Sequence, residues 1–112
     1  MSKIKILIAD DHAVVRMGLS ALFRAKGDLD VVGQARDGEE AVAEARRLKP
    51  DVVVLDLMMP KASGVEATDA LRRAAPGVRI LVLTSYATTD GIAQALKAGA
   101  SGAILKSAET SE

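Results

Sequence analysis

The sequence predicts a doubly wound α/β fold, in which helices cover both faces of a parallel sheet. Short apolar runs rich in β-branched residues recur along the chain and alternate with stretches of helical periodicity. The predicted strands are Ile4–Ala9, Val31–Ala35, Val52–Leu55, Ile80–Leu83 and Ala103–Leu105. Strands and helices that alternate with short connections favour right-handed crossovers, which place helices on both sides of the sheet.

The runs in the middle of the chain indicate strands at the centre of the sheet. Val52–Leu55 and Ile80–Leu83 are apolar at every position, whereas a strand with one face in water alternates apolar and polar residues. Between the runs, apolar residues follow the spacing of a helix face. The clearest stripes are Val15, Leu19 and Leu22 in the first predicted helix and Ala41, Ala45 and Leu48 in the second.

Residues that begin and end helices stand between the apolar runs. Asp37 and Glu40 have the spacing of a capping box, in which two side chains bond the first amide groups of a helix. Ser63 and Glu66 repeat this spacing ahead of the next helix. Helices are expected to stop near Gly27, Pro50, Pro76, Gly77 and Gly99. The predicted chain alternates five strands with four helices, and a fifth helix begins near Ser107.

Length and composition predict one domain, residues 1–112, and exclude several functions. Fifteen Lys and Arg against fifteen Asp and Glu give no net charge. A domain that binds nucleic acid through its overall charge would be basic. Phe23 and Tyr86 are the only aromatic residues, which excludes a base-stacking platform. With no cysteine and only His12, the chain has no disulfide, thiolate nucleophile, cysteine–zinc site or multi-histidine metal site.

The apolar runs are too short for a membrane span, which needs about 18 apolar residues. The opening MSKIKILIADD has lysines followed by an apolar stretch, as a signal peptide has, but two aspartates end that stretch early. We therefore expect a soluble cytoplasmic domain that makes no contact with a membrane.

Polar side chains gather at the carboxyl ends of the predicted strands. Asp10 and Asp11 follow the first strand, Asp56 the third, Thr84 the fourth and Lys106 the fifth. Each of them alone is more often an ordinary cap or strand-end residue. Ligands of open α/β sheets bind at this edge, however, and all of these residues are expected there. The sequence therefore predicts one pocket with three carboxylates, a hydroxyl and an ammonium group.

Three carboxylates in one pocket favour a bound cation. Two carboxylates about 5 Å apart repel each other by about 3 kcal/mol at an effective dielectric constant near 20. All-oxygen ligands without histidine or cysteine favour a hard cation, and we expect Mg²⁺. Mg²⁺, an ammonium and a hydroxyl can together hold a phosphoryl group during transfer. The available nucleophile is a carboxylate, so the expected product is an aspartyl-phosphate.

The motifs IADDH, VVVLDLMMP, VLTSY and GASGAILK resemble the receiver domain of bacterial two-component response regulators. The segment DDHAVVRMGL resembles the subgroup whose receiver precedes a LuxR-type helix-turn-helix DNA-binding domain. The resemblance covers nearly the whole chain. It implies a flavodoxin-like, five-stranded parallel sheet with strand order 2-1-3-4-5, which the pattern of residues alone does not fix.

The resemblance also implies how the pocket works. Asp56 would be the phosphoacceptor, and a sensor histidine kinase would supply the phosphoryl group. Asp11 and Asp56 would bind Mg²⁺ directly, together with the backbone carbonyl of Met58. Asp10 would act on the ion largely through water.

The switch is expected to involve the last two strands. By the same resemblance, Lys106 would neutralise phosphoryl oxygens, and Thr84 would move to hydrogen-bond the phosphoryl group. Ala103 stands where receivers usually carry a Tyr or Phe whose ring reports the switch, so the coupling cannot take its usual form. Ser107 stands where many receivers have a proline after the lysine, and the isomer of the Lys106–Ser107 bond stays open.

Three alternative functions are weighed against this one. A Mg²⁺-dependent phosphohydrolase of the haloacid-dehalogenase type needs an acid two residues after its nucleophile, where this chain has Met58 after Asp56 and His12 after Asp10. A flavin or nucleotide binder needs a glycine- or hydroxyl-rich loop after the first strand, where this chain has carboxylates. A phosphorylation-independent pseudo-receiver stays possible because of Ala103.

The remaining expectations concern partners. We expect a homodimer, although the sequence does not fix the oligomeric state, and we expect DNA binding only through an output domain that this chain lacks. Six residues follow Lys106, too few for a complete fifth helix, which we expect to be missing or truncated. We therefore expect the natural protein to continue past Glu112, or a neighbouring copy to cover the gap. His12 is expected to be a helix-start residue near the acidic pocket.

Overall fold

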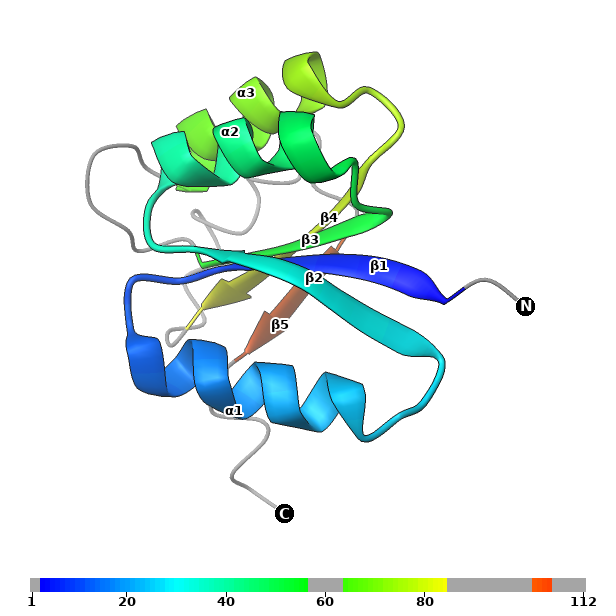
Figure 1. Ribbon diagram of the computed structural model, residues 1–112. Coiled ribbons are helices and arrows are strands. Elements are labelled where there is room, and N and C mark those ends of the chain that lie inside the picture. Colours follow the sequence, from blue (N-terminus) through cyan, green and yellow to red (C-terminus); the bar gives the residue numbers. More distant parts are fainter. Residues whose placement is uncertain (1–2, 57–63, 85–101, 106–112) are drawn as a thin grey trace.

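A parallel sheet with a helical layer on each face forms the protein, as the computed structural model in Figure 1 shows. The structure describes residues 3–56, 64–84 and 102–105. The strands are β1 (Ile4–Ala9), β2 (Leu29–Ala35), β3 (Val52–Asp56), β4 (Arg79–Thr84) and β5 (Gly102–Leu105). The described helices are α1 (Ala13–Arg24), α2 (Gly38–Leu48) and α3 (Gly64–Ala74).

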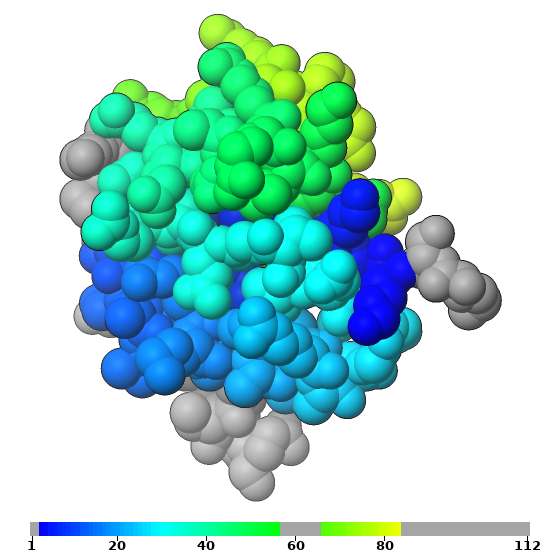
Figure 2. All heavy atoms as spheres, viewed as in Figure 1, coloured from blue at the N-terminus to red at the C-terminus, as the bar shows by residue number. Residues whose placement is uncertain are grey.

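The order of the strands is β2-β1-β3-β4-β5, and every neighbouring pair is parallel. This confirms the strand order that the resemblance implied. Helices α2 and α3 lie on one face of the sheet, and α1 lies on the other (Figure 1). In the view with all atoms drawn, the edge strand β2 lies between α1 and α2 (Figure 2). No helix of the described ranges is long and apolar enough to cross a membrane.

The central strands contribute side chains to both faces because side chains alternate along a strand. Leu7 of β1 packs on the side of α2 and α3, and Ile8 packs on the side of α1. In β3, Val53 and Leu55 likewise belong to the first cluster and Val54 to the second. Burial on both faces explains why the middle strands are apolar at every position.

One helical stripe differs from the prediction. Leu19 is buried and Val15 packs against the core, as expected, but Leu22 is 46% exposed. Phe23, four residues after Leu19, packs against the core instead. Residues three or four positions after Leu19 lie on the same helix face as Leu19. The position of α1 on the sheet buries the residue four positions later, Phe23.

The predicted capping box at the start of α2 is confirmed. The Asp37 side chain accepts a hydrogen bond of 2.8 Å from the backbone N–H of Glu40. The Glu40 carboxylate in turn accepts one of 2.8 Å from the backbone N–H of Arg36, one residue ahead of the cap. Ser63 lies outside the described residues, as do the predicted helices between Thr84 and β5 and after Lys106.

The edge strand β2 contains a bulge that the sequence did not reveal. Ile6 of β1 is paired with Val31, and the next residue, Leu7, is paired with Gly33. Val32 is therefore the extra residue of a β-bulge. A Cβ atom on Gly33 would lie 2.5 Å from Cδ1 of Leu48, at the end of α2. The missing side chain thus lets the end of α2 approach the strand.

Candidate metal centre

The acidic residues lie at the carboxyl edge of the two central strands. Asp10 directly follows β1, and Asp56 is the last residue of β3. The two strands are neighbours, and Ala9 is paired with Leu55. Because parallel strands end at the same edge, Asp10 and Asp56 are brought side by side although they are far apart in the sequence.

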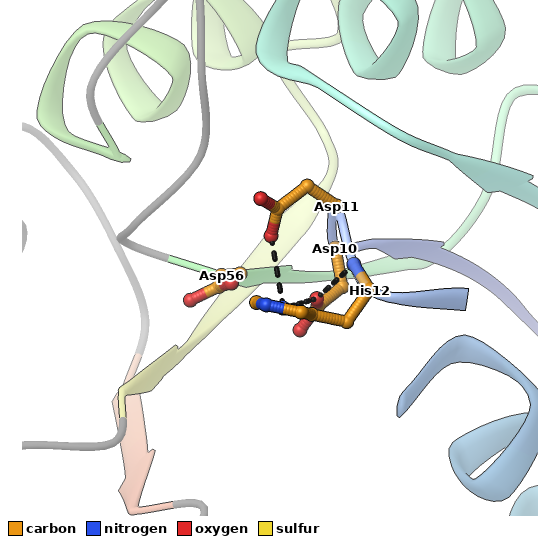
Figure 3. A group of neighbouring side chains, drawn as sticks. All are labelled: Asp10, Asp11, His12 and Asp56. Carbon is orange, nitrogen blue, oxygen red and sulfur yellow. Dashed lines mark hydrogen bonds and ion pairs between the residues drawn. The ribbon is translucent and has the colours of Figure 1, made fainter. Parts of the chain in front are cut away.

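Four side chains converge at this edge, as Figure 3 shows. Asp10, Asp11, His12 and Asp56 each offer one ligand atom, and these atoms all lie within 4.8 Å of one another. Asp10 and Asp56 are buried, at 0% and 1% exposure, and form the floor of the site. Asp11 and His12 are exposed and form its rim. The structure thus brings the three predicted carboxylates together.

The ring of His12 lies among the carboxylates (Figure 3). Its Nδ1 atom is 3.1 Å from Oδ1 of Asp10 and 3.0 Å from Oδ1 of Asp11. The backbone N–H of His12 also donates a hydrogen bond of 2.8 Å to Oδ1 of Asp10. The prediction that His12 starts a helix is confirmed, since it is the N-cap of α1. The sequence reasoning missed that its ring belongs to the site, and the direct succession Asp10-Asp11-His12 was the available signal.

Arg16 was also missed by the sequence reasoning. Its Nη1 donates a hydrogen bond of 2.7 Å to the backbone carbonyl of Asp10, and its Nε donates one of 3.3 Å to the side-chain oxygen of Gln34. Arg16 follows His12 by one helical turn, which is the spacing that returns a side chain to the start of the helix. It ties α1 to the ends of β1 and β2.

The residues present fit a hard divalent cation. Carboxylate oxygens are the ligands that Mg²⁺ prefers, and oxygens on opposite sides of an octahedral Mg²⁺ lie about 4.2 Å apart. The four candidate ligand atoms, which include a ring nitrogen of His12, all lie within 4.8 Å of one another. A cation at this position would also offset the repulsion between two buried carboxylates. The acidic cluster could therefore hold a divalent ion at this edge of the sheet.

The other predicted site residues are placed only in part. Thr84 is the last residue of β4, and its neighbour Leu83 is paired with Asp56. The backbone of Thr84 therefore reaches the same edge as the acidic group, and it is paired with Leu105 of β5. Ala103 is paired with Val82. Met58, Lys106 and Ser107 lie outside the described residues, so their roles stay predictions.

Comparisons with known proteins agree with this arrangement. The family model of the response regulator receiver domain matches residues 6–112. The response regulator protein VraR of Staphylococcus saprophyticus is 38% identical over 109 residues, which are 97% of this chain and 52% of VraR. The transcriptional regulatory protein LnrK of Bacillus subtilis is 45% identical over 103 residues, which are 92% of this chain and 47% of LnrK. The chain thus spans about half the length of these relatives.

A solved structure leads to the same family. The crystal structure of a two-component response regulator of the LuxR family from Aurantimonas superimposes with a TM-score of 0.92 and 37% sequence identity. The superposition covers 99% of this chain and 79% of that one. A phosphorylation-based switch is the function of the family, and the acidic group stands at the sheet edge where the fold binds its ligands. The chain belongs to the response regulator receiver domain family.

Proposed function

We propose that this chain is a single receiver domain, residues 1–112, and that Asp56 accepts a phosphoryl group from a sensor histidine kinase in a Mg²⁺-dependent reaction. The observation that supports the proposal most is the convergence of Asp10, Asp11 and Asp56 at one edge of a receiver-family sheet. Response regulators as a class are phosphorylated by histidine kinases. The choice of kinase is proposed to depend on the whole protein and not on this domain alone.

The transfer follows from the position of the Asp56 carboxylate. One of its oxygens attacks the phosphorus of the phosphohistidine, a P–O bond forms, the P–N bond breaks, and the imidazole leaves. Asp11, Asp56 and the backbone carbonyl of Met58 would hold Mg²⁺, with Asp10 acting through water. The ion supplies positive charge that offsets the negative charge of carboxylate and phosphoryl oxygens.

The switch is assigned to Thr84 and Lys106. Lys106 would pair with phosphoryl oxygens, and the Thr84 hydroxyl would move to donate a hydrogen bond to one of them. The backbone of Thr84 ends at the same edge as Asp56, which supports this assignment. The position of Ala103, next to Val82 in the sheet, means that no aromatic ring on β5 couples to this movement.

Phosphorylation can be tested with a small phosphodonor such as acetyl phosphate, with intact mass as the readout. The wild type should gain one phosphoryl group in Mg²⁺ and none in excess chelator. Asp56→Asn should gain none, because its amide is not a nucleophile. Asp30→Asn is the matched control, since Asp30 lies exposed on β2. Equal labelling of Asp56→Asn and the wild type would overturn the proposal.

The domain is proposed to act as a signalling domain and not as an enzyme on exogenous substrates. A phosphohydrolase would use an acid two residues after its nucleophile, and Met58 stands there. The same mass assay discriminates the two functions when inorganic phosphate is also measured. We expect about one phosphoryl group per chain and slow release. Sustained release of many phosphates per chain would identify a phosphohydrolase.

We also propose that a second copy of the domain packs against α1. Val14 and Met17 are 81% and 67% exposed and lie one helical turn apart near the start of α1. Leu22, near the end of α1, is 46% exposed. A two-fold axis would place this apolar stripe of three residues against itself. Sedimentation of the phosphorylated chain should show a dimer that Met17→Lys weakens. Ala43→Lys, at an exposed apolar residue of α2 on the opposite face of the sheet (Figure 1), should not weaken it.

Binding to DNA is proposed only for the whole protein, through a part outside this chain. The relatives VraR and LnrK are about twice as long as the matched region, and LnrK is a transcriptional regulatory protein. The chain itself has no net charge at pH 7, so its overall charge does not attract the phosphate groups of DNA. We expect a cytoplasmic location, and this chain alone should not shift duplex DNA in a gel.

A further inference from the structure

We propose that His12 makes the acidic site a mixed imidazole–carboxylate centre that prefers a first-row transition metal to Mg²⁺. The metal would be held by Nδ1 of His12 together with carboxylate oxygens of Asp10, Asp11 and Asp56. The inference rests on the proposed function, because the same carboxylates would hold Mg²⁺. It goes further because it assigns the choice of ion to a residue outside the predicted ligand set.

The ring of His12 is not used to cap its helix. His12 is the N-cap of α1 and has an extended backbone, but its side chain makes no capping hydrogen bond. N-cap positions prefer short side chains that accept a bond from the first turn. The ring turns back from the helix and lies beside Asp10 and Asp11 (Figure 3). Its position is therefore explained by the carboxylates and not by the helix.

Hydrogen-bond and ion-pair contacts hold the ring against the carboxylates, and their lengths also suit two ligands of one metal ion. Nδ1 is 3.1 Å from Oδ1 of Asp10 and 3.0 Å from Oδ1 of Asp11. Ligand atoms about 2.1 Å from a metal and at adjacent corners of an octahedron lie about 3.0 Å apart. A metal ion that replaced the Nδ1 proton could thus contact all three atoms with little movement of the side chains.

The ligand set determines which ions are favoured. Mg²⁺ takes oxygen ligands and gains little from an imidazole, whereas imidazole suits Ni²⁺, Cu²⁺ and Zn²⁺. The chain has one histidine and no cysteine, so His12 is the only side chain that can give the site this character. The part of the preference for transition metals that comes from an imidazole ligand therefore depends on one residue.

The exposure of the site allows the two kinds of ion to exchange. The side chain of His12 is 64% exposed, and that of Asp11 is 31% exposed. Asp10 and Asp56 are buried beneath them. An ion can enter over the rim, and the ring can leave it without disturbing the core. A transition metal and Mg²⁺ would compete for the same buried carboxylates, those of Asp10 and Asp56.

The first test measures the affinities of the untagged chain for Co²⁺ and Mg²⁺ by calorimetry, in the wild type and in His12→Ala. Loss of a residue that only orients a metal ligand costs about 10- to 100-fold in affinity, so loss of a direct ligand should cost at least about tenfold. We expect the ratio of Co²⁺ affinity to Mg²⁺ affinity to fall by at least that factor. His12→Gln, which keeps a polar side chain without an imidazole, should behave like His12→Ala.

The second test identifies the ligand directly. Pulsed electron paramagnetic resonance of bound Cu²⁺ detects the remote nitrogen of a coordinated imidazole. Because the chain has a single histidine, this signal can come only from His12. It should be present in the wild type and absent in His12→Gln. Circular dichroism of both chains checks that the variant is folded.

The outcomes separate the two proposals. If His12→Ala keeps the wild-type ratio of affinities and Cu²⁺ shows no imidazole signal, the role of His12 is overturned while the Mg²⁺ site stands. If the wild type binds neither ion and gains no phosphoryl group in Mg²⁺, the proposed function fails. Asp56→Asn should weaken both ions, because both use that carboxylate.

Discussion

Arg16 Nη1 and the backbone carbonyl oxygen of Asp10 are joined by a hydrogen bond of 2.7 Å. The same guanidinium reaches the side chain of Gln34 on β2 at 3.3 Å. Arg16 therefore connects α1 to the ends of β1 and β2. Its contact with β1 lies where the chain turns into Asp10 and Asp11. The position of the carboxylates depends on this helix as well as on the sheet.

Replacing Arg16 should loosen the acidic turn. In Arg16→Lys, a single ammonium cannot reproduce the fork that contacts both Asp10 and Gln34. Loss of a hydrogen bond from a charged donor costs about 1.5–3 kcal/mol, and we expect a loss of unfolding free energy at the low end of that range. Urea unfolding measures it, and Mg²⁺ affinity should fall with it. Arg24→Lys, at the exposed end of α1, is the control and should change neither.

Mg²⁺ should raise the melting temperature of the wild type, because it binds the folded site and not the unfolded chain. The expected gain is about 2.7 kcal/mol at a Mg²⁺ concentration about 100 times the dissociation constant. In chelator, Asp56→Asn should be more stable than the wild type, because one of the adjacent buried carboxylates is removed. The same variant should lose most of the response to Mg²⁺. A variant that melts below the wild type in chelator would contradict carboxylate repulsion as the main effect.

Gly33→Ala should destabilise the protein through the close approach of α2. The new Cβ would meet the side chain of Leu48 at 2.5 Å and that of Leu7 at 3.4 Å. Overpacking typically costs about 1–3 kcal/mol, and the lower end applies because Leu48 is half-buried and can move. Gly18→Ala is the matched control. Gly18 lies inside α1 with nothing within 4 Å of its new Cβ, so alanine should stabilise the helix by about 1 kcal/mol.

Removing the cap of α2 should also destabilise the protein. Asp37→Ala deletes the acceptor of the Glu40 amide and should cost about 0.5–2 kcal/mol in unfolding free energy. Asp37→Asn keeps an acceptor of the same length and ranks with Asp at N-caps, so it should lose far less. Thermal melting of the two variants side by side measures the difference. Equal losses in both would assign the effect to the charge of Asp37 and not to its hydrogen bond.

The sequence by itself determined the elements and the edge where chemistry is placed. Hydrophobic periodicity predicted each described strand to within two residues, because burial on one or both faces has a direct signature in the pattern of residues. It also placed Asp10, Asp11 and Asp56 at strand ends, and the parallel arrangement brings such ends together. The strand order came from the family resemblance, since periodicity carries no information on which strands are neighbours.

Only the tertiary structure decided how side chains meet across elements. The bulge at Val32 and the contact of Gly33 with α2 depend on how closely a helix packs on the edge strand, which no local pattern encodes. The turn after β1 likewise places the ring of His12 beside Asp10. The packing of α1 on the sheet brings the guanidinium of Arg16 to the carbonyl of Asp10. Each side chain has rotatable bonds and can take several directions from one backbone position. The groups they reach, in the turn after β1 and on β2, select one direction, because a buried polar group without a hydrogen-bond partner costs free energy.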